Sequence, residues 1–175
     1  MAGHNKWTKI KHKKATEDEG RGKLFSKLAN NIAIAARGNP DPQFNPSLRS
    51  AIEQAKKNNM PQANIERAIS KANESNAGEE LLIEVYGAEG IGILVKAATD
   101  NSNRTISEIK VILKTHDAKL AEPGSLAWAF EKTPDGYAPK FKSPASTEAV
   151  EKIAKLIEAL DNHNDVQEVY SSLQS

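Results

Sequence analysis

The residues in this sequence that are best suited to chemistry are cations gathered near its N-terminus. Lysines alternate there with one tryptophan and one histidine: Lys6, Trp7, Lys9, Lys11, His12, Lys13 and Lys14. Ammonium groups bind phosphates and release condensed counterions, and an indole ring stacks on an unpaired base. Three more cations, Arg21, Lys23 and Lys27, follow at the beginning of the first expected helix. We therefore predict that these ten residues contact nucleic acid.

The distribution of charge along the chain also indicates a polyanionic partner. The formal net charge of the 175 residues is only +1, yet residues 1–75 hold 14 Lys and Arg against 7 Asp and Glu, which gives +7. Residues 76–175 hold 10 cations and 16 acids, which gives −6. A basic half joined to an acidic half indicates that the first binds nucleic acid, while the second has another role, such as contact with a protein partner. The alternative is that the basic segment only keeps the protein soluble.

No set of residues indicates an enzyme. The chain has no cysteine, and its four histidines show no spacing typical of metal ligands: His4, His12, His116 and His163. The stretch "GAEGIG" (residues 87–92) is followed by an expected strand, whereas a dinucleotide site needs a helix there. No Gly-x-Ser-x-Gly motif is present. We expect no catalytic residue, no metal site and no cofactor.

The basic residues are expected to be held by a bundle of three helices. Residues 1–22 have few apolar side chains and are assigned to a flexible arm, which ends at Gly20-Arg21-Gly22. Residues 23–75 show apolar side chains with the period of amphipathic helices, the first beginning at Lys23. The residues expected to open the second and third helices are Asn45, Pro46 and Pro61.

Residues 79–175 are expected to form an α+β domain. The apolar period changes to two in the runs 81–86 and 91–98, which a hairpin joins. A capping box at Thr105 and Glu108 is expected to start a helix. The remaining expected elements are a half-buried strand over residues 125–130, an edge strand that contains Pro139, a helix over 147–161 and a strand over 165–170. The order of elements predicts an antiparallel sheet with helices on one face.

The longest apolar runs are far shorter than the roughly 20 residues that a membrane helix needs. The basic N-terminal residues are not followed by the apolar segment of a signal peptide. We therefore expect a cytoplasmic protein that has no membrane partner and no small-molecule substrate.

Several stretches of the sequence resemble the YebC family. The opening "MAGHNKW", "IKHKKA" and "RGKLFSKL" are similar to the signature of that family, and the resemblance continues through "YGAEG", "TDNSNRT", "GSLAWAF" and "NDVQEVY". The family includes bacterial proteins described as probable transcriptional regulators and a mitochondrial translational activator. The resemblance implies a three-helix N-terminal domain, α+β domains of ferredoxin-like type, and nucleic-acid binding without catalysis. It also implies an additional inserted domain, which we expect to be absent because "TPDGYAPKFKSPAS" crosses that place in a few residues.

Two functions for the basic surface follow from this resemblance. The first is a DNA-binding transcriptional regulator, and the alternative is an RNA-binding translation factor or activator associated with the ribosome. The third expected helix offers only Asn64, Arg67 and Lys71 to bases, which is little for sequence-specific recognition. We expect a sequence-tolerant nucleic-acid binder of the kind that is most often described as a DNA-binding transcriptional regulator. A second alternative is a protein-interaction module that binds no nucleic acid.

Overall fold

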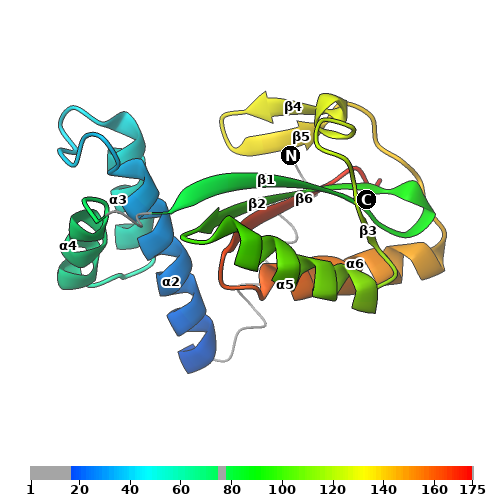
Figure 1. Ribbon diagram of the computed structural model, residues 1–175, viewed down its shortest axis with the longest axis horizontal. Helices are drawn as coiled ribbons and strands as arrows, with labels where there is room; N and C mark the ends of the chain where they lie inside the picture. Colours follow the sequence, from blue (N-terminus) through cyan, green and yellow to red (C-terminus); the bar gives the residue numbers. More distant parts are fainter. Residues whose placement is uncertain (1–16, 75–77, 175) are drawn as a thin grey trace.

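The chain folds into a helical part followed by an α+β part in the computed structural model, which describes residues 17–74 and 78–174 (Figure 1). The helices of the first part are α2 (Glu17–Ala35), α3 (Pro46–Lys57) and α4 (Gln62–Lys71). The second part contains β1 (Glu79–Tyr86), β2 (Gly92–Thr99), α5 (Ser102–Thr115), β3 (Lys119–Leu120), β4 (Phe130–Thr133), β5 (Gly136–Pro139), α6 (Thr147–Asp161) and β6 (Val166–Ser171). Short 3₁₀ turns lie at Ala88–Gly90 and Ala127–Ala129. The predicted α+β class is confirmed.

The three helices of the first part share one apolar core. α3 begins where predicted, because the side-chain oxygen of Asn45 accepts the backbone N–H of Leu48 at 3.0 Å and Pro46 occupies the first turn. Leu48 is fully buried against Ile32 of α2 and Ile65 of α4. Helices this short are marginal alone in water, so their stability comes from this shared core.

Helix α2 begins earlier than the sequence predicted. It starts at Glu17, so Gly20 and Gly22 lie inside the helix, and the prediction of a first helix that begins at Lys23 is wrong. A glycine inside a helix costs only about 1 kcal/mol relative to alanine, which the packing of the remaining turns offsets. Residues 1–16 of the predicted arm lie outside the described part of the chain.

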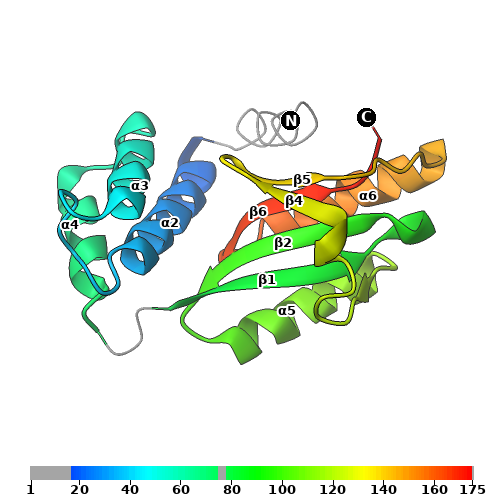
Figure 2. The same cartoon turned by 90° about the horizontal axis from the view of Figure 1, so that it is seen from above.

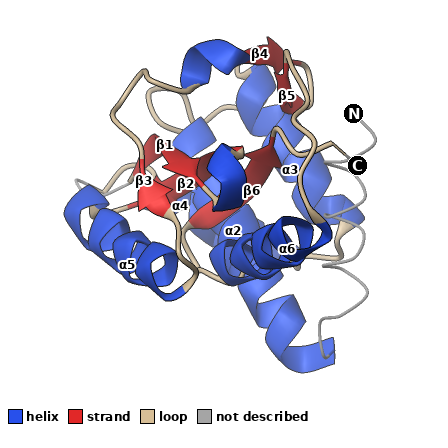
Figure 3. Ribbon diagram, turned by 90° about the vertical axis from the view of Figure 1, so that its right-hand side faces the viewer, coloured by secondary structure: helices blue, strands red, loops and turns tan. Residues whose placement is uncertain are grey.

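Four strands of the second part form an antiparallel sheet in the order β3–β1–β2–β6. β1 and β2 pair along all 8 residues of each strand, joined by the predicted hairpin. α5 and α6 cover one face of the sheet, and the β4–β5 hairpin lies over the other (Figure 2, Figure 3). The helices therefore lie on one face as predicted. Ile109 of α5 and Ile153 of α6 share an apolar core with Val95 of β2.

A buried glutamate shapes the segment that precedes β4. Glu84 is 7% exposed. Its carboxylate accepts three backbone N–H groups, from Gly124 at 2.6 Å, Leu126 at 2.6 Å and Ala127 at 2.8 Å. These bonds curl the chain into a 3₁₀ turn, so the strand predicted for residues 125–130 is wrong over most of its length. Trp128, within the strand predicted for these residues, is 63% exposed.

Helix α5 begins about one turn before the predicted capping box. The side chain of Asn101 caps it by accepting the backbone N–H of Arg104 at 3.1 Å. Thr105 and Glu108 therefore lie inside the helix, and their prediction as a capping box is wrong. Asn is as good an N-cap residue as Thr, so the local pattern alone did not distinguish the two starts.

The last elements agree with the sequence. α6 covers the predicted residues 147–161, and the Ser146 hydroxyl caps it by accepting the N–H of Ala149 at 3.2 Å. Pro139 lies in the two-stranded β4–β5 hairpin, and β6 matches the predicted last strand within one residue. None of the helices in the described ranges combines the length and apolar character that a membrane crossing requires.

Replacement of Glu84 by glutamine is expected to destabilise the fold by about 1–3 kcal/mol, because one amide oxygen cannot serve all three N–H groups. Burial raises the pKa of Glu84, but the bonds from Gly124, Leu126 and Ala127 outweigh burial and hold the pKa below its ordinary value. Such a carboxylate stabilises the native state above its unfolded pKa of about 4.3, and the contribution is lost as the pH falls through the folded pKa. Urea unfolding at pH ~7 and at pH ~3 measures both effects.

Glu131→Gln in β4 is the matched control, because the exposed Glu131 side chain has no polar partner among the described residues. The role of Glu84 is contradicted if Glu84→Gln and Glu131→Gln unfold at the same urea concentration near neutral pH.

Candidate nucleic-acid interface

The predicted contact residues fall into two groups. Seven of them lie outside the described residues, so their role stays a prediction: Lys6, Trp7, Lys9, Lys11, His12, Lys13 and Lys14. The other three lie on α2, where Arg21 and Lys23 are exposed and Lys27 is buried.

Lys27 joins the helical bundle to the α+β part. Its side chain is 5% exposed, and its ammonium group donates a hydrogen bond to the backbone oxygen of Asp161 at 2.5 Å. Asp161 is the last residue of α6, where carbonyl groups have no partner within the helix and a cation is favourable. This contact turns Lys27 away from solvent, so we do not place it in the nucleic-acid interface. The sequence pattern did not reveal this, because it assigned only one buried face to α2.

A polar cavity of about 650 Å³ lies between α2 and the α+β part. The bundle contributes two exposed lysines, Lys23 and Lys71, and the other side contributes the beginning of α5 and the loop between α6 and β6. The polar side chains that line the cavity are Lys23, Asn30, Lys71, Thr99, Asp100, Arg104, Glu108, Asn162, His163, Asn164 and Asp165. The cavity therefore has cations on its bundle side and a mixed set of charges on the other.

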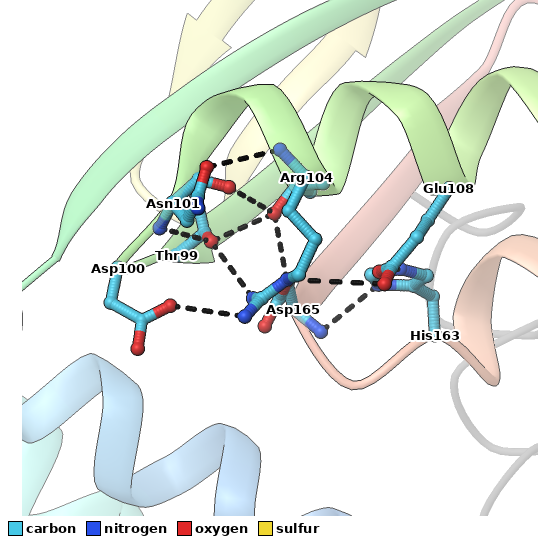
Figure 4. A network of polar contacts seen from close by, with 8 residues as sticks. Thr99, Asp100, Asn101, Arg104, Glu108, His163 and Asp165 are labelled. Atoms are coloured by element: carbon cyan, nitrogen blue, oxygen red, sulfur yellow. Dashed lines mark hydrogen bonds and ion pairs between the residues drawn. The ribbon is translucent and has the colours of Figure 1, made fainter.

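A hydrogen-bonded network fills the α+β side of this cavity (Figure 4). The carboxylate of Asp165, which is 8% exposed, accepts a hydrogen bond from the Arg104 guanidinium at 2.7 Å. The fully buried hydroxyl of Thr105 lies 2.7 Å from both Asp165 Oδ2 and Thr99 Oγ1. The hydrogen bond and charge of Asp165 raise the pKa of Arg104. Arg104 therefore neutralises a buried acid.

Three side chains of this network, Glu108, His163 and Asp165, hold their ligand atoms within 4.8 Å of one another, as a metal site would. The backbone N–H of Asp165 donates to His163 Nδ1 at 3.1 Å, so a neutral ring carries its proton on Nε2, which donates to Glu108 at 2.7 Å. In that tautomer both nitrogens of His163 are engaged in hydrogen bonds, so the ring has no free lone pair for a metal. The Asp165 carboxylate already accepts a hydrogen bond from Arg104. The geometry favours a hydrogen-bonded network here; the absence of a metal site in the whole chain stays a prediction.

A second, smaller hollow lies between α2 and α4 and has a volume of about 240 Å³. We call it the α2–α4 groove, and its lining is Phe25, Ser26, Ala29, Met60, Asn64, Arg67, Ala68 and Lys71. Asn64, Arg67 and Lys71 follow one another at helical spacing on α4, so their side chains share one face. Lys71 lines both the groove and the larger cavity. The sequence singled out these three polar residues but gave no signal that Phe25 lies beside them.

Comparison with known proteins adds the family. Residues 5–75 match the model of the TACO1/YebC protein N-terminal domain, and residues 78–134 match the model of the TACO1/YebC second and third domain. The chain belongs to the TACO1/YebC family. The resemblance to the YebC family seen in the sequence is therefore confirmed.

Several relatives in this family are named "Probable transcriptional regulatory protein". One from Natranaerobius thermophilus is 52% identical over 136 residues, which cover 75% of this chain and 54% of the relative. One from Halothermothrix orenii is 35% identical over 239 aligned positions, which cover 98% of this chain and 94% of the relative. The chain spans just over half the length of the Natranaerobius relative. A crystal structure of a conserved hypothetical protein from Aquifex aeolicus superposes with a TM-score of 0.85 at 31% identity, over 92% of this chain and 93% of that one.

The alignment with the Halothermothrix relative indicates residues that this chain lacks. It contains 239 positions, although this chain has 175 residues, so the relative has residues with no counterpart in this chain. The match to the second and third domain ends at residue 134, in the tight turn between β4 and β5. That an inserted domain is absent stays a prediction.

Replacement of Asp165 by asparagine is expected to destabilise the protein by about 1–3 kcal/mol, because it weakens the bonds to Arg104 and Thr105 in a buried place. Arg104→Gln is expected to lower the free energy of unfolding less in the Asp165→Asn variant than in the wild-type protein, because the two residues share one interaction. Urea unfolding of both single variants and the double variant measures this coupling.

Glu151→Gln, an exposed acid on α6, is the control for loss of one negative charge. Strict additivity of the Arg104 and Asp165 variants contradicts the coupling proposed for this network.

Proposed function

We propose that the chain is a nucleic-acid-binding regulator of gene expression. The observation that carries this proposal is the exposed charge of the helical bundle. Residues 17–74 contain nine Lys or Arg against seven Asp or Glu, three of these acids being the first three residues of α2, and eight of the nine cations are exposed, Lys27 being the exception. Within the described ranges none of these eight cations makes an ion pair. Unpaired cations gathered in one part of a protein are the electrostatic footprint of a phosphate-binding surface.

The interface that we propose combines the basic arm with α2 and α4. From the arm it includes Lys6, Trp7, Lys9, Lys11, His12, Lys13 and Lys14, and from the helices it includes Arg21, Lys23, Arg67 and Lys71. Arg67 and Lys71 line the groove, and Lys23 and Lys71 line the larger cavity. Arg21 is exposed on α2, two residues before Lys23. Phosphate contacts of this kind supply affinity and orientation, not sequence recognition.

We infer that the target is DNA and that the process is transcription, because relatives in the family carry the name of transcriptional regulators. The alternative target is RNA, in a factor that assists translation on the ribosome. It is supported by the small number of side chains on α4 that face outward beside the groove, because Asn64, Arg67 and Lys71 are few for reading a sequence in the major groove. Both targets use the same phosphate contacts.

Binding to a DNA duplex and to a single strand is expected to weaken steeply as the salt concentration rises, because each phosphate contact releases counterions. Lys23→Gln and Arg67→Gln are each expected to lower the logarithmic salt slope by about one. Lys155→Gln, which removes an exposed cation from α6, is the matched control and leaves the slope unchanged. Fluorescence anisotropy of labelled oligonucleotides at several salt concentrations measures these slopes.

Lys27→Met separates structure from binding in the same assay. It is expected to lower the free energy of unfolding, since it removes the contact with Asp161, and to leave the salt slope unchanged. Affinity that does not depend on salt, or a slope that Lys23→Gln and Arg67→Gln do not alter, contradicts the proposed function and favours a protein partner.

A further inference from the structure

We propose that the α2–α4 groove binds one unpaired nucleotide of a single-stranded nucleic acid, with its base on the apolar floor and its phosphate on the cations at the rim. This inference rests on the proposed function and makes it more specific, because a surface made only of cations binds duplex and single strand alike. The groove adds a reason to prefer the single strand.

The size and the lining of the groove fit one flat apolar ring. Its volume of about 240 Å³ lies below the roughly 300–1,000 Å³ of sites for drug-sized molecules, which suits a single base. Phe25 and Ala29 of α2 line it together with Met60 and Ala68. Aromatic side chains stack on the faces of unpaired bases of any sequence, and the sulfur of methionine makes favourable contacts with aromatic rings. In a duplex the bases are stacked on one another, so none can enter the groove without being extruded.

The charges along the rim of the groove fit a phosphate. Arg67 and Lys71 are exposed and lie on the face of α4 that lines the groove, and no carboxylate lines it. The nearest acid on α4, Glu66, accepts a hydrogen bond from Gln62 at 3.1 Å and does not line the groove. The amide of Asn64 offers both a donor and an acceptor to the edge of a base. The groove therefore presents apolar, amide and cationic groups in the combination that a nucleotide requires.

The position of Lys71 allows the bound single-stranded nucleic acid to extend from the groove into the larger cavity. Lys71 lines both the groove and the cavity between α2 and the α+β part, where Lys23 supplies the next cation. Asn30, Asn162 and Asn164 line the same cavity and offer amide groups to a neighbouring base. A single strand whose base occupies the groove thus has a second polar site next to it, with Lys71 lining both.

The test compares single strand and duplex for variants inside and outside the groove. Labelled oligouridine, a DNA strand of about 12 nucleotides and the duplex of that DNA strand are titrated with the full chain in fluorescence anisotropy. Phe25→Leu keeps an apolar side chain on the floor but removes the ring. Phe141→Leu is the control outside the groove and removes an aromatic ring that is 69% exposed on the α+β part.

We expect Phe25→Leu to weaken single-strand binding about tenfold and duplex binding less than about twofold, since it removes one stacked base. Phe141→Leu is expected to change neither affinity. Thermal unfolding by circular dichroism verifies that Phe25→Leu is folded, and ultraviolet crosslinking of oligouridine that carries 5-iodouridine tests the wild-type contact. The crosslinked peptide is expected to contain Phe25 or Met60.

Equal loss of single-strand and duplex affinity in Phe25→Leu, or a crosslink confined to the α+β part, overturns the groove while salt-dependent binding still supports the proposed function. Absence of salt-dependent binding to all three oligonucleotides overturns the proposed function itself. A larger effect on oligouridine than on the DNA strand identifies RNA as the source of the nucleotide, and the reverse identifies DNA.

Discussion

Helix α2 is packed on two sides, and the position of every candidate contact depends on this constraint. One side contributes Leu28 and Ile32 to the core that α2 shares with α3 and α4. The opposite side places Lys27 against the carbonyl of Asp161 and lines the cavity between α2 and the α+β part. Figure 1 shows α2 standing between the other two helices and the sheet. Because both sides are occupied, the exposed cations of α2 are left at the margins, beside the groove and beside the cavity.

The two halves of the chain differ in their balance of charge, which is +7 over residues 1–75 and −6 over residues 76–175. In the α+β part, Arg104 neutralises the buried Asp165, and surface pairs join Lys96 to Glu80 and Lys152 to Glu148. In the bundle, the exposed cations within the described ranges have no carboxylate partner, and the same holds for seven exposed lysines of the α+β part: Lys110, Lys114, Lys119, Lys132, Lys140, Lys142 and Lys155. An exposed pair contributes little to stability, but an unpaired cation is free to bind phosphate. The difference explains how a chain with a net charge of +1 can present a basic surface to a polyanion.

Most elements could be predicted from the sequence because their signals are local. Asn45, Pro46 and Ser146 mark helix starts by their own hydrogen bonds or ring geometry, and the apolar runs of β1 and β2 with the glycines between them mark a hairpin. The segment before β4 could not be predicted, because its conformation is set by Glu84, about 40 residues earlier in the chain. The residues around 124–127 do not indicate that the acceptor of their N–H groups is Glu84.

The candidate site was predictable in its chemistry but not in its geometry. The basic character of the arm and of α2 follows from composition, and the exposure of Arg21 and Lys23 agrees with it. The burial of Lys27 and the neighbourhood of Phe25 and Arg67 depend on how α2 packs against the rest of the fold. Contacts between elements are tertiary, and residue types that alternate along one helix do not specify them.

The most direct test of whether the bundle contacts nucleic acid is hydrogen–deuterium exchange of the full chain with and without a bound oligonucleotide. The account predicts slower exchange in the peptides of α2 and α4, with little change in α5, α6 and the β4–β5 hairpin. Protection confined to the α+β part, with α2 and α4 unchanged, would contradict it.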